Sequence, residues 1–291
     1  RADRTTAVAD LYAKANPGFS YEGEFAAFND YWPKLGTQVA GGNAPDVIQM
    51  DYRYVVEYAK RGAIAALDDF VGNALDLGDF DADQIEGGKV DGKLYAISLG
   101  ANSVAMMVNT KAFQDAGVDL PTRDWTYEDY KKNGEAMRSK TGMAILADGS
   151  GNEPTLENFL RQRGKALYTA DGQIAFDAQD ITDFFKMWAD LRDAGACVGP
   201  EDQALDATAA IDTTMISLHK AATSFANSNQ LIGFQAVNPD PLTMINFPRI
   251  APGSGGGHYR KPSMFWSVNP KSALLEDSVK FVSFFINDVD A

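Results

Sequence analysis

The sequence has 291 residues, of which 45% are apolar and 23% are charged, proportions typical of an ordinary globular chain with one large or two medium domains. Forty acidic residues against 26 basic ones give a net charge of −14, and the basic residues form no cluster longer than Lys131-Lys132, so we expect no nucleic-acid partner. No apolar run approaches the roughly 18 residues of a membrane-spanning helix.

The first half of the chain alternates between helical and strand-like patterns. Apolar residues spaced three and four apart predict helices over residues 8–15, 26–40 and 54–60. Short apolar runs predict strands over residues 46–50, 93–98 and 104–108. Asp91-Gly92 indicates a hairpin turn. A capping box is expected near residue 126, with Thr126 as N-cap and Asp129 in place of the usual Glu.

The second half continues the same alternation. Helices are expected after Pro154, over residues 181–191 and over residues 278–286. Strands are expected over residues 143–147, 215–218, 244–247 and 264–268. We interpret the glycine-rich run PGSGGGH at residues 252–258 as a flexible connection. Strands that alternate with helices along the whole chain favour the α/β fold class.

The strand over residues 46–50 ends abruptly in three large polar side chains. Asp51, Tyr52 and Arg53 come directly before a helix-like segment that stops at Gly62. Open α/β sheets bind ligands where strands end in this way. We therefore expect residues 51–53 to face a ligand.

Residue types that carry enzyme chemistry are sparse. His219 and His258 are the only histidines, Cys197 is the only cysteine, and no H-E-x-x-H, C-x-x-C or G-x-S-x-G pattern occurs. The glycine-rich run lacks the Gly-Lys-Ser/Thr ending of a phosphate-binding loop. We predict no catalytic residues, no metal and no cofactor. A glycosidase needs only two facing acids, which 40 acidic residues could supply, so a carbohydrate hydrolase stays open.

Three blocks of sequence, in the right order, resemble one family. They are AGGNAPDVI at residues 40–48, the group DGKLYAI, MVNTK and DWTYED between residues 91 and 129, and residues 250–285. Together they resemble the extracellular solute-binding proteins of ABC importers, of the carbohydrate-binding type that includes maltose-binding protein. Ser98 replaces a proline of the family pattern, and residues 211–215 depart from its usual Gly-Lys-Ala-Ala-Met.

The resemblance implies a two-lobed α/β fold with a ligand cleft between the lobes. Lobe 1 would comprise residues 1–108, lobe 2 residues 109–250, and residues 251–291 would return to lobe 1. The family pattern also has a first strand and C-terminal helices that we expect this chain to lack. The implied function is to bind a sugar or small glycoside by hinge closure and deliver it to a membrane permease, as a monomer in the periplasm or at the cell surface. An anionic solute, such as a phosphate ester or sulfonate, remains an alternative ligand.

The resemblance also assigns candidate ligand-binding residues. These are Asp51, Tyr52, Arg53, Asn102, Ser103, Asn152, Glu153, His258, Tyr259 and Trp266. Glu153 lies in a loop similar to the Gln-Glu-Pro-aromatic loop of the family, where Thr155 replaces the aromatic residue and removes its stacking. Trp266 is the expected stacking platform for a sugar ring, and His258 and Tyr259 are expected at the cleft entrance.

Overall fold

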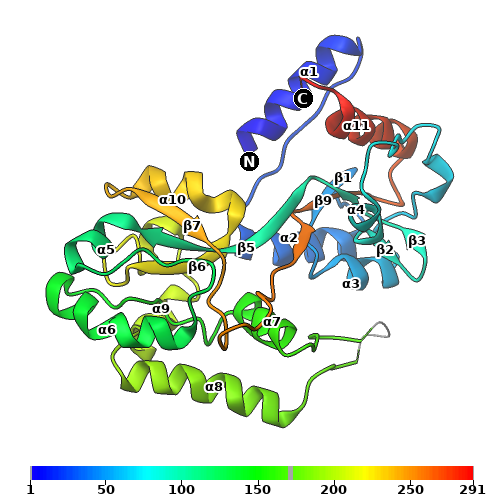
Figure 1. The fold of residues 1–291 in the computed structure, drawn as a ribbon. Helices are drawn as coiled ribbons and strands as arrows, with labels where there is room; N and C mark the ends of the chain where they lie inside the picture. The colour runs from blue at the N-terminus through cyan, green and yellow to red at the C-terminus, as the bar shows by residue number, and fades with distance from the viewer. Residues whose placement is uncertain (1, 170–172, 291) are drawn as a thin grey trace. The chain divides into compact units, whose positions relative to one another are not determined.

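A computed structural model describes residues 2–169 and 173–290, and the chain divides into two compact units (Figure 1). Unit 1 comprises residues 1–101 and 261–291, and unit 2 comprises residues 102–260. Both units combine helices with a sheet, so the predicted α/β class is confirmed.

The chain crosses between the units at different positions from those expected. It leaves unit 1 after Ala101, not after Val108, and it returns after Arg260, not after residue 250. The reason is the strand β5 (Ala101–Asn109), which is a central strand of the unit 2 sheet. The strand that contains the return crossing, β8 (Arg260–Pro262), pairs with β5 and lies at the same sheet.

Unit 1 is built on a small antiparallel sheet with the strand order β1-β9-β4. Its strands are β1 (Val47–Met50), β4 (Ile97–Ser98) and β9 (Phe265–Val268), beside a hairpin of β2 (Lys89–Val90) and β3 (Lys93–Leu94). Its helices are α1 (Ala2–Ala15), α2 (Phe28–Gly41), α3 (Val55–Lys60), α4 (Ala82–Glu86), α11 (Leu275–Asn287) and the 3₁₀ turn at Asp68–Phe70.

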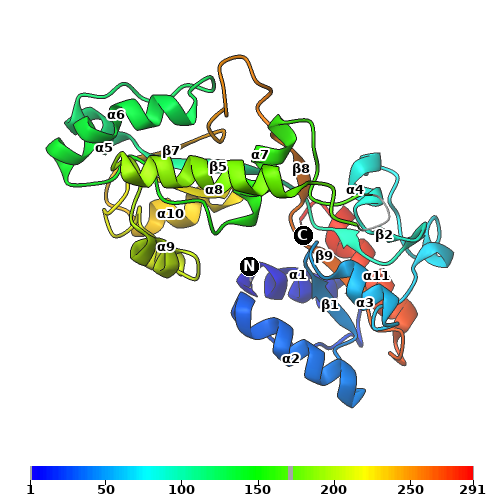
Figure 2. The ribbon, with the colours of Figure 1, turned by 90° about the horizontal axis from the view of Figure 1, so that it is seen from below.

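Helices cover the unit 1 sheet on both faces, because side chains along a strand alternate between them (Figure 2). Ile48, Met50 and Phe265 pack with α2 and α3 on one face. Trp266 and Val268 pack with α11 on the other face. Cover on both faces explains why all four residues of the middle strand β9 are buried, Ser267 included.

Unit 2 is built on the sheet β6-β5-β7, to which β8 adds by pairing with β5. Its remaining strands are β6 (Thr223–Asn227) and β7 (Leu242–Ile245), both antiparallel to β5. Its helices are α5 (Thr110–Ala116), α6 (Tyr127–Thr141), α7 (Glu153–Gln162), α8 (Ala178–Asp193), α9 (Pro200–Asp206) and α10 (Leu231–Val237), with 3₁₀ turns at Ile211–Thr213 and Ser228–Gln230.

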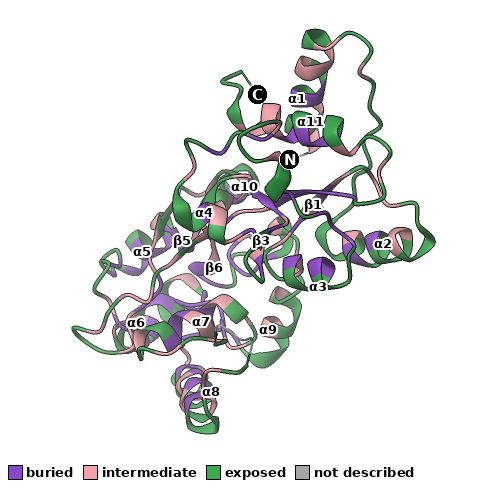
Figure 3. Cartoon of the chain, turned by 90° about the vertical axis from the view of Figure 1, so that its right-hand side faces the viewer, coloured by how far each residue is buried: buried purple, intermediate pink, exposed green. Residues whose placement is uncertain are grey.

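The main core of unit 2 lies between the sheet and the helices α5 to α8. Met106 of β5 packs there with aromatic residues that include Phe113, Phe159 and Trp188. On the opposite face, Met107 packs with Phe234 of α10. Figure 3 shows buried positions of α8 along one side and exposed positions along the other, the pattern that its apolar spacing predicts.

Most predicted elements are present, and the capping box is confirmed: Thr126 accepts the N–H of Asp129, whose carboxylate accepts the N–H of Thr126. The strand predicted over residues 215–218 is wrong, since this segment is a turn in which Met215 and Ile216 are buried, and the strand begins at Thr223. Residues 143–147 form only isolated parallel pairs, at Ala144 and Leu146, and not a continuous strand. Met215, Ile216 and residues 143–147 are all buried, and burial alone does not specify a strand.

Candidate functional site

The polar residues after β1 form a tight turn in unit 1. Asp51 follows Met50, the last and fully buried residue of the strand, and its carboxylate accepts the N–H of Arg53 at 3.0 Å. The backbone oxygen of Asp51 accepts the N–H of Tyr54 at 2.9 Å, which starts the turn into α3. Tyr52 is 55% exposed and Arg53 is exposed. We call residues 51–54 the unit 1 turn.

Aromatic residues of α2 contact the unit 1 turn and the strand before it. Tyr54 stacks on Trp32 of α2 with ring centroids 4.0 Å apart and an interplanar angle of 27°. Tyr31 donates its hydroxyl to the backbone oxygen of Gln49 at 2.8 Å, and burial raises the pKa of that hydroxyl. β1 pairs antiparallel with β9, so the turn does not lie at the edge of a parallel sheet. Its position depends instead on the packing of Tyr54 against Trp32.

The second candidate segment, residues 148–155, leads into and includes the first turn of α7, and it is held from within unit 2; we call it the unit 2 loop. The carboxylate of Asp148 accepts the N–H of Ser150 at 2.8 Å and forms an ion pair with Arg192 of α8. The hydroxyl of Thr155 lies in hydrogen-bond contact with the carbonyl oxygens of Gly149 and Asn152. The loop is therefore fixed at both of its ends.

The candidate residues of the unit 2 loop occupy the beginning of α7. Asn152 is the N-cap residue and is half-buried, and Glu153 is exposed at the first helical position. An acidic side chain at this position interacts favourably with the positive end of the helix dipole. Thr155 is 0% exposed and packs in the core, so the position where the family pattern has an aromatic residue serves the fold in this chain.

Asn102 and Ser103 lie within β5, as the first two residues of unit 2. Asn102 is 9% exposed, and the N–H of Ser103 donates to the hydroxyl of Ser228 at 3.2 Å. Both residues therefore lie at the start of a central strand of the unit 2 sheet.

His258 and Tyr259 make contacts with the body of unit 2. The Nε2 atom of His258 accepts the N–H of Phe247 at 3.2 Å, and burial lowers the pKa of His258. The guanidinium of Arg161 lies 4.3 Å from the centroid of the Tyr259 ring. Burial raises the pKa of the Tyr259 hydroxyl, and a hydrogen bond with Glu157 raises it further. Both residues therefore have packing roles that the expectation of a cleft entrance did not include.

Trp266 lies in the core of unit 1 and is only 7% exposed. It pairs in register with Gln49 of β1 and Ile97 of β4, and its ring meets Phe285 edge to face at 5.4 Å. This burial favours core packing over the predicted stacking platform. The physical reason is that β9 is the middle strand of the sheet, so side chains on both of its faces are covered by helices.

The ten candidate residues therefore fall into two groups, one in each unit. Within unit 2, α7 connects the unit 2 loop to Tyr259 through Glu157 and Arg161, which the sequence interpretation did not single out. The i, i+4, i+8 spacing of Glu153, Glu157 and Arg161 is the signal that could have placed them on one helix face.

Three further findings concern possible sites outside the candidate residues. A hollow of about 230 Å³ lies between α6 and α8, lined by residues that include Tyr127, Lys131 and Met187, and none of the candidate residues lines it. Across residues 2–169 and 173–290, no group of three or more His, Cys, Asp or Glu side chains could hold a metal ion. In the same described part of the chain, no helix is both long and apolar enough to cross a membrane.

Comparison with solved structures shows the same fold in other solute-binding proteins. An extracellular solute-binding protein, family 1, from Alicyclobacillus acidocaldarius is 30% identical with a TM-score of 0.70, and the match covers 99% of this chain and 72% of that one. An oligogalacturonide-binding protein from Yersinia enterocolitica, solved with saturated digalacturonic acid, has a TM-score of 0.85 at 18% identity, with coverages of 99% and 72%.

Sequence comparison leads to the same group. The diacetylchitobiose-binding protein DasA of Streptomyces coelicolor is 34% identical over 129 residues, which are 43% of this chain and 29% of that protein. The aligned segment spans less than a third of the length of the curated relatives that the chain matches. Residues 7–289 match the family described as bacterial extracellular solute-binding protein. The chain therefore belongs to the bacterial extracellular solute-binding protein family.

Proposed function

We propose that this protein binds a sugar or small glycoside between its two units and delivers it to the permease of an ABC importer. The observation that carries the choice of ligand is the similarity to DasA, which is named for binding diacetylchitobiose. The family itself is one of binding proteins and is extracellular, which supports a periplasmic or cell-surface location and a role without covalent chemistry.

The chemistry of the candidate residues supports a neutral, hydroxyl-rich ligand. Sugar hydroxyls need paired donors and acceptors, because a buried unpaired polar group costs on the order of 1–3 kcal/mol. Asp51 and Glu153 are acceptors, Arg53 is a donor, and Asn102 and Asn152 can do both. Tyr52, which is 55% exposed, takes the place of Trp266 as the candidate aromatic surface for a sugar ring.

Ligand binding would act by shifting the protein from an open to a closed form. Such a shift requires that the ligand bind the closed form more tightly, with side chains of both units. The unit 1 turn and the unit 2 loop are the two segments that we propose for these contacts.

The test is a ligand panel of N,N′-diacetylchitobiose, maltose, digalacturonic acid and glucose 6-phosphate. We expect a neutral sugar to raise the melting temperature, with about 2.7 kcal/mol of stabilisation at a concentration one hundred times its Kd. Small-angle X-ray scattering should show a smaller radius of gyration in the same sample. If no member of the panel changes either quantity, the proposal fails.

The same panel separates the alternatives. Binding of only digalacturonic acid or glucose 6-phosphate would indicate an importer component for anionic solutes. Chromatographic detection of monosaccharide released from diacetylchitobiose or maltose would instead indicate a carbohydrate hydrolase.

A further inference from the structure

The glycine-rich run that the sequence suggested to be flexible is bound along α7. We call residues 248–258 the strap. The side-chain oxygen of Gln162, the last residue of α7, accepts the N–H of Ile250 at 2.8 Å and the hydroxyl of Ser254 at 2.9 Å. Its side-chain nitrogen donates to the backbone oxygen of Pro248 at 2.9 Å. A single side chain thus binds the strap at three points.

A second side chain, one turn earlier in α7, holds the next part of the strap. Asn158 is 0% exposed, and its amide nitrogen donates to the backbone oxygen of Gly256 at 3.0 Å. Gln162 also donates to the side-chain oxygen of Asn158 at 2.8 Å, so the two amides form one connected network. The buried amide of Asn158 fixes the geometry most strongly, because breaking its bond to the strap would leave a buried polar group unpaired.

Gly257 is the point of closest approach between the strap and the helix. Its φ is +62°, and a Cβ atom there would lie 2.5 Å from the backbone oxygen of Asn158 and 2.7 Å from Cγ of Gln162. Gly255, two residues earlier, has open space around its own Cβ position and no positive φ. The same run thus contains one glycine that the contact requires and one that it does not.

The strap lies at one end of a helix whose other end carries the unit 2 loop. α7 has ten residues, and at 1.5 Å per residue it spans about 15 Å from Glu153 to Gln162. The residues after the strap add Tyr259, stacked on Arg161 of the same helix, and the chain then leaves unit 2 after Arg260. One continuous helix therefore connects the residues that bind the strap to the unit 2 loop.

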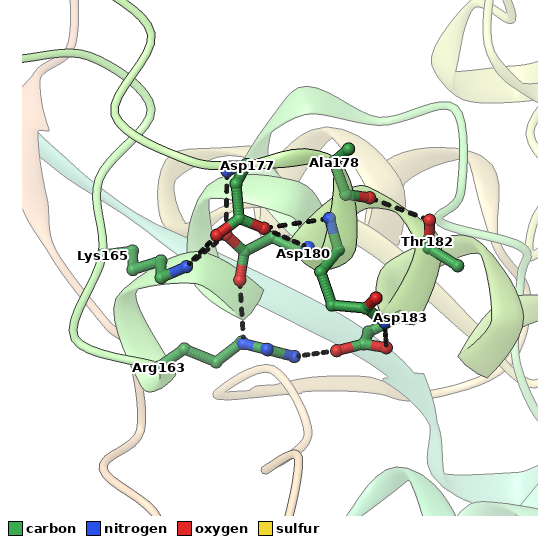
Figure 4. A network of polar contacts seen from close by, with 8 residues as sticks. Arg163, Lys165, Asp177, Ala178, Asp180, Thr182 and Asp183 are labelled. Atoms are coloured by element: carbon green, nitrogen blue, oxygen red, sulfur yellow. Dashed lines mark hydrogen bonds and ion pairs between the residues drawn. The ribbon is translucent and has the colours of Figure 1, made fainter.

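Beyond α7, charged residues tie the helix to α8, as Figure 4 shows. Asp180 is 0% exposed and contacts Arg163 at 3.1 Å and Lys165 at 2.5 Å. These two cations directly follow α7, so its C-terminal end is held by the strap on one side and by α8 on the other.

We propose that the strap positions α7, and through it the unit 2 loop, so that Asn158, Gln162 and Gly257 are positioning residues for ligand binding. None of the three is a candidate ligand contact. The inference rests on the proposed function for its effect on affinity, but the coupling between strap and loop can be measured without any ligand.

The experiment compares Gly257→Ala with the matched control Gly255→Ala. For the panel sugar that the wild type binds, we expect Gly257→Ala to raise Kd about tenfold, because the left-handed backbone and the contact with Asn158 both resist a Cβ. Gly255→Ala should stay within about twofold of wild type. Hydrogen exchange of ligand-free protein should speed up in Gly257→Ala at Ile250 in the strap and also at Ser150 and Thr155 in the unit 2 loop.

A purely structural strap predicts a different result. Faster exchange at residues 248–258 alone, with unchanged Kd and unchanged exchange at Ser150 and Thr155, would overturn the proposal. If Gly257→Ala does not fold, Gln162→Met replaces it with Gln114→Met, an exposed position on α5, as its control, and the same criteria apply. If the wild type binds no sugar, the proposed function fails, whereas the exchange coupling still supports or overturns the positioning role.

Discussion

The unit 1 turn follows a strand and is closed by hydrogen bonds among its own residues, whereas the unit 2 loop leads into the first turn of a helix and is also held by a side chain from elsewhere in the fold. In the turn, Asp51 bonds to residues two and three positions later in the chain. In the loop, Asp148 pairs with Arg192, 44 positions away. Mutations near the loop should therefore affect stability and binding together, whereas mutations in the turn should mainly affect binding.

The largest expected effect on stability is in the loop. Arg192→Met would leave the carboxylate of Asp148, whose side chain is 0% exposed, without its cation. We expect a loss of about 3 kcal/mol in the free energy of unfolding, measured by urea denaturation. The control Lys34→Met breaks an ion pair with Glu24 whose partners are 46% and 45% exposed, and it should cost about 1 kcal/mol or less. Equal costs for the two variants would contradict a buried, fold-determining role for Asp148.

The proposed ligand contacts should respond through affinity. Asp51→Asn and Glu153→Gln each replace a charged acceptor, and hydrogen bonds to charged groups contribute roughly 1.5–3 kcal/mol, which corresponds to about a 10- to 100-fold rise in Kd. Isothermal titration with the bound panel sugar measures this change. Glu128→Gln, an exposed acid on α6, is the control. An unchanged Kd for both test variants would place the ligand elsewhere.

A smaller stability effect is expected in the unit 1 turn. Asp51→Ala removes the acceptor for the N–H of Arg53, which the turn can expose to water in exchange. We expect a cost of about 1 kcal/mol by urea denaturation, well below that of Arg192→Met. A cost as large as that of Arg192→Met would show that the Asp51 carboxylate holds more of the fold than the N–H of Arg53.

The smallest effect should be a pH dependence carried by His258. Burial lowers the pKa of His258, and its neutral Nε2 accepts the N–H of Phe247. Because the folded pKa lies below the unfolded value of about 6.5, this contribution is fully present above that pH and declines as the pH falls through it. The stability difference between pH 7.5 and pH 5.5 should therefore shrink in His258→Gln. An identical difference in both proteins would mean that His258 does not contribute.

Local features of the candidate site were predictable from the sequence. The strand before Asp51, the unit 1 turn after it and the start of α7 near Pro154 all depend on residues close in the chain. Their signals are apolar runs, helix-start residues and turn residues, which act over a few positions. The capping box of Thr126 and Asp129 is the clearest example, because both of its bonds join residues three positions apart.

Features that depend on distant partners were not predictable in this way. Trp266 and Tyr259 are aromatic residues beside polar ones, and their sequences do not show that α11 covers the first and Arg161 stacks on the second. The strand predicted over residues 215–218 failed for the same reason, since burial in a turn and burial in a strand select the same apolar residues.

The sequence by itself determined the α/β class, the family resemblance and the positions of most helices, because these follow from periodicity and from short motifs. Only the tertiary structure decided where the chain crosses between the units, that Trp266 belongs to a core, and that the glycine-rich strap is bound to α7. The physical reason is that glycine allows both flexible chain and close backbone packing. The choice between them depends on Asn158 and Gln162, which lie about 90 residues away.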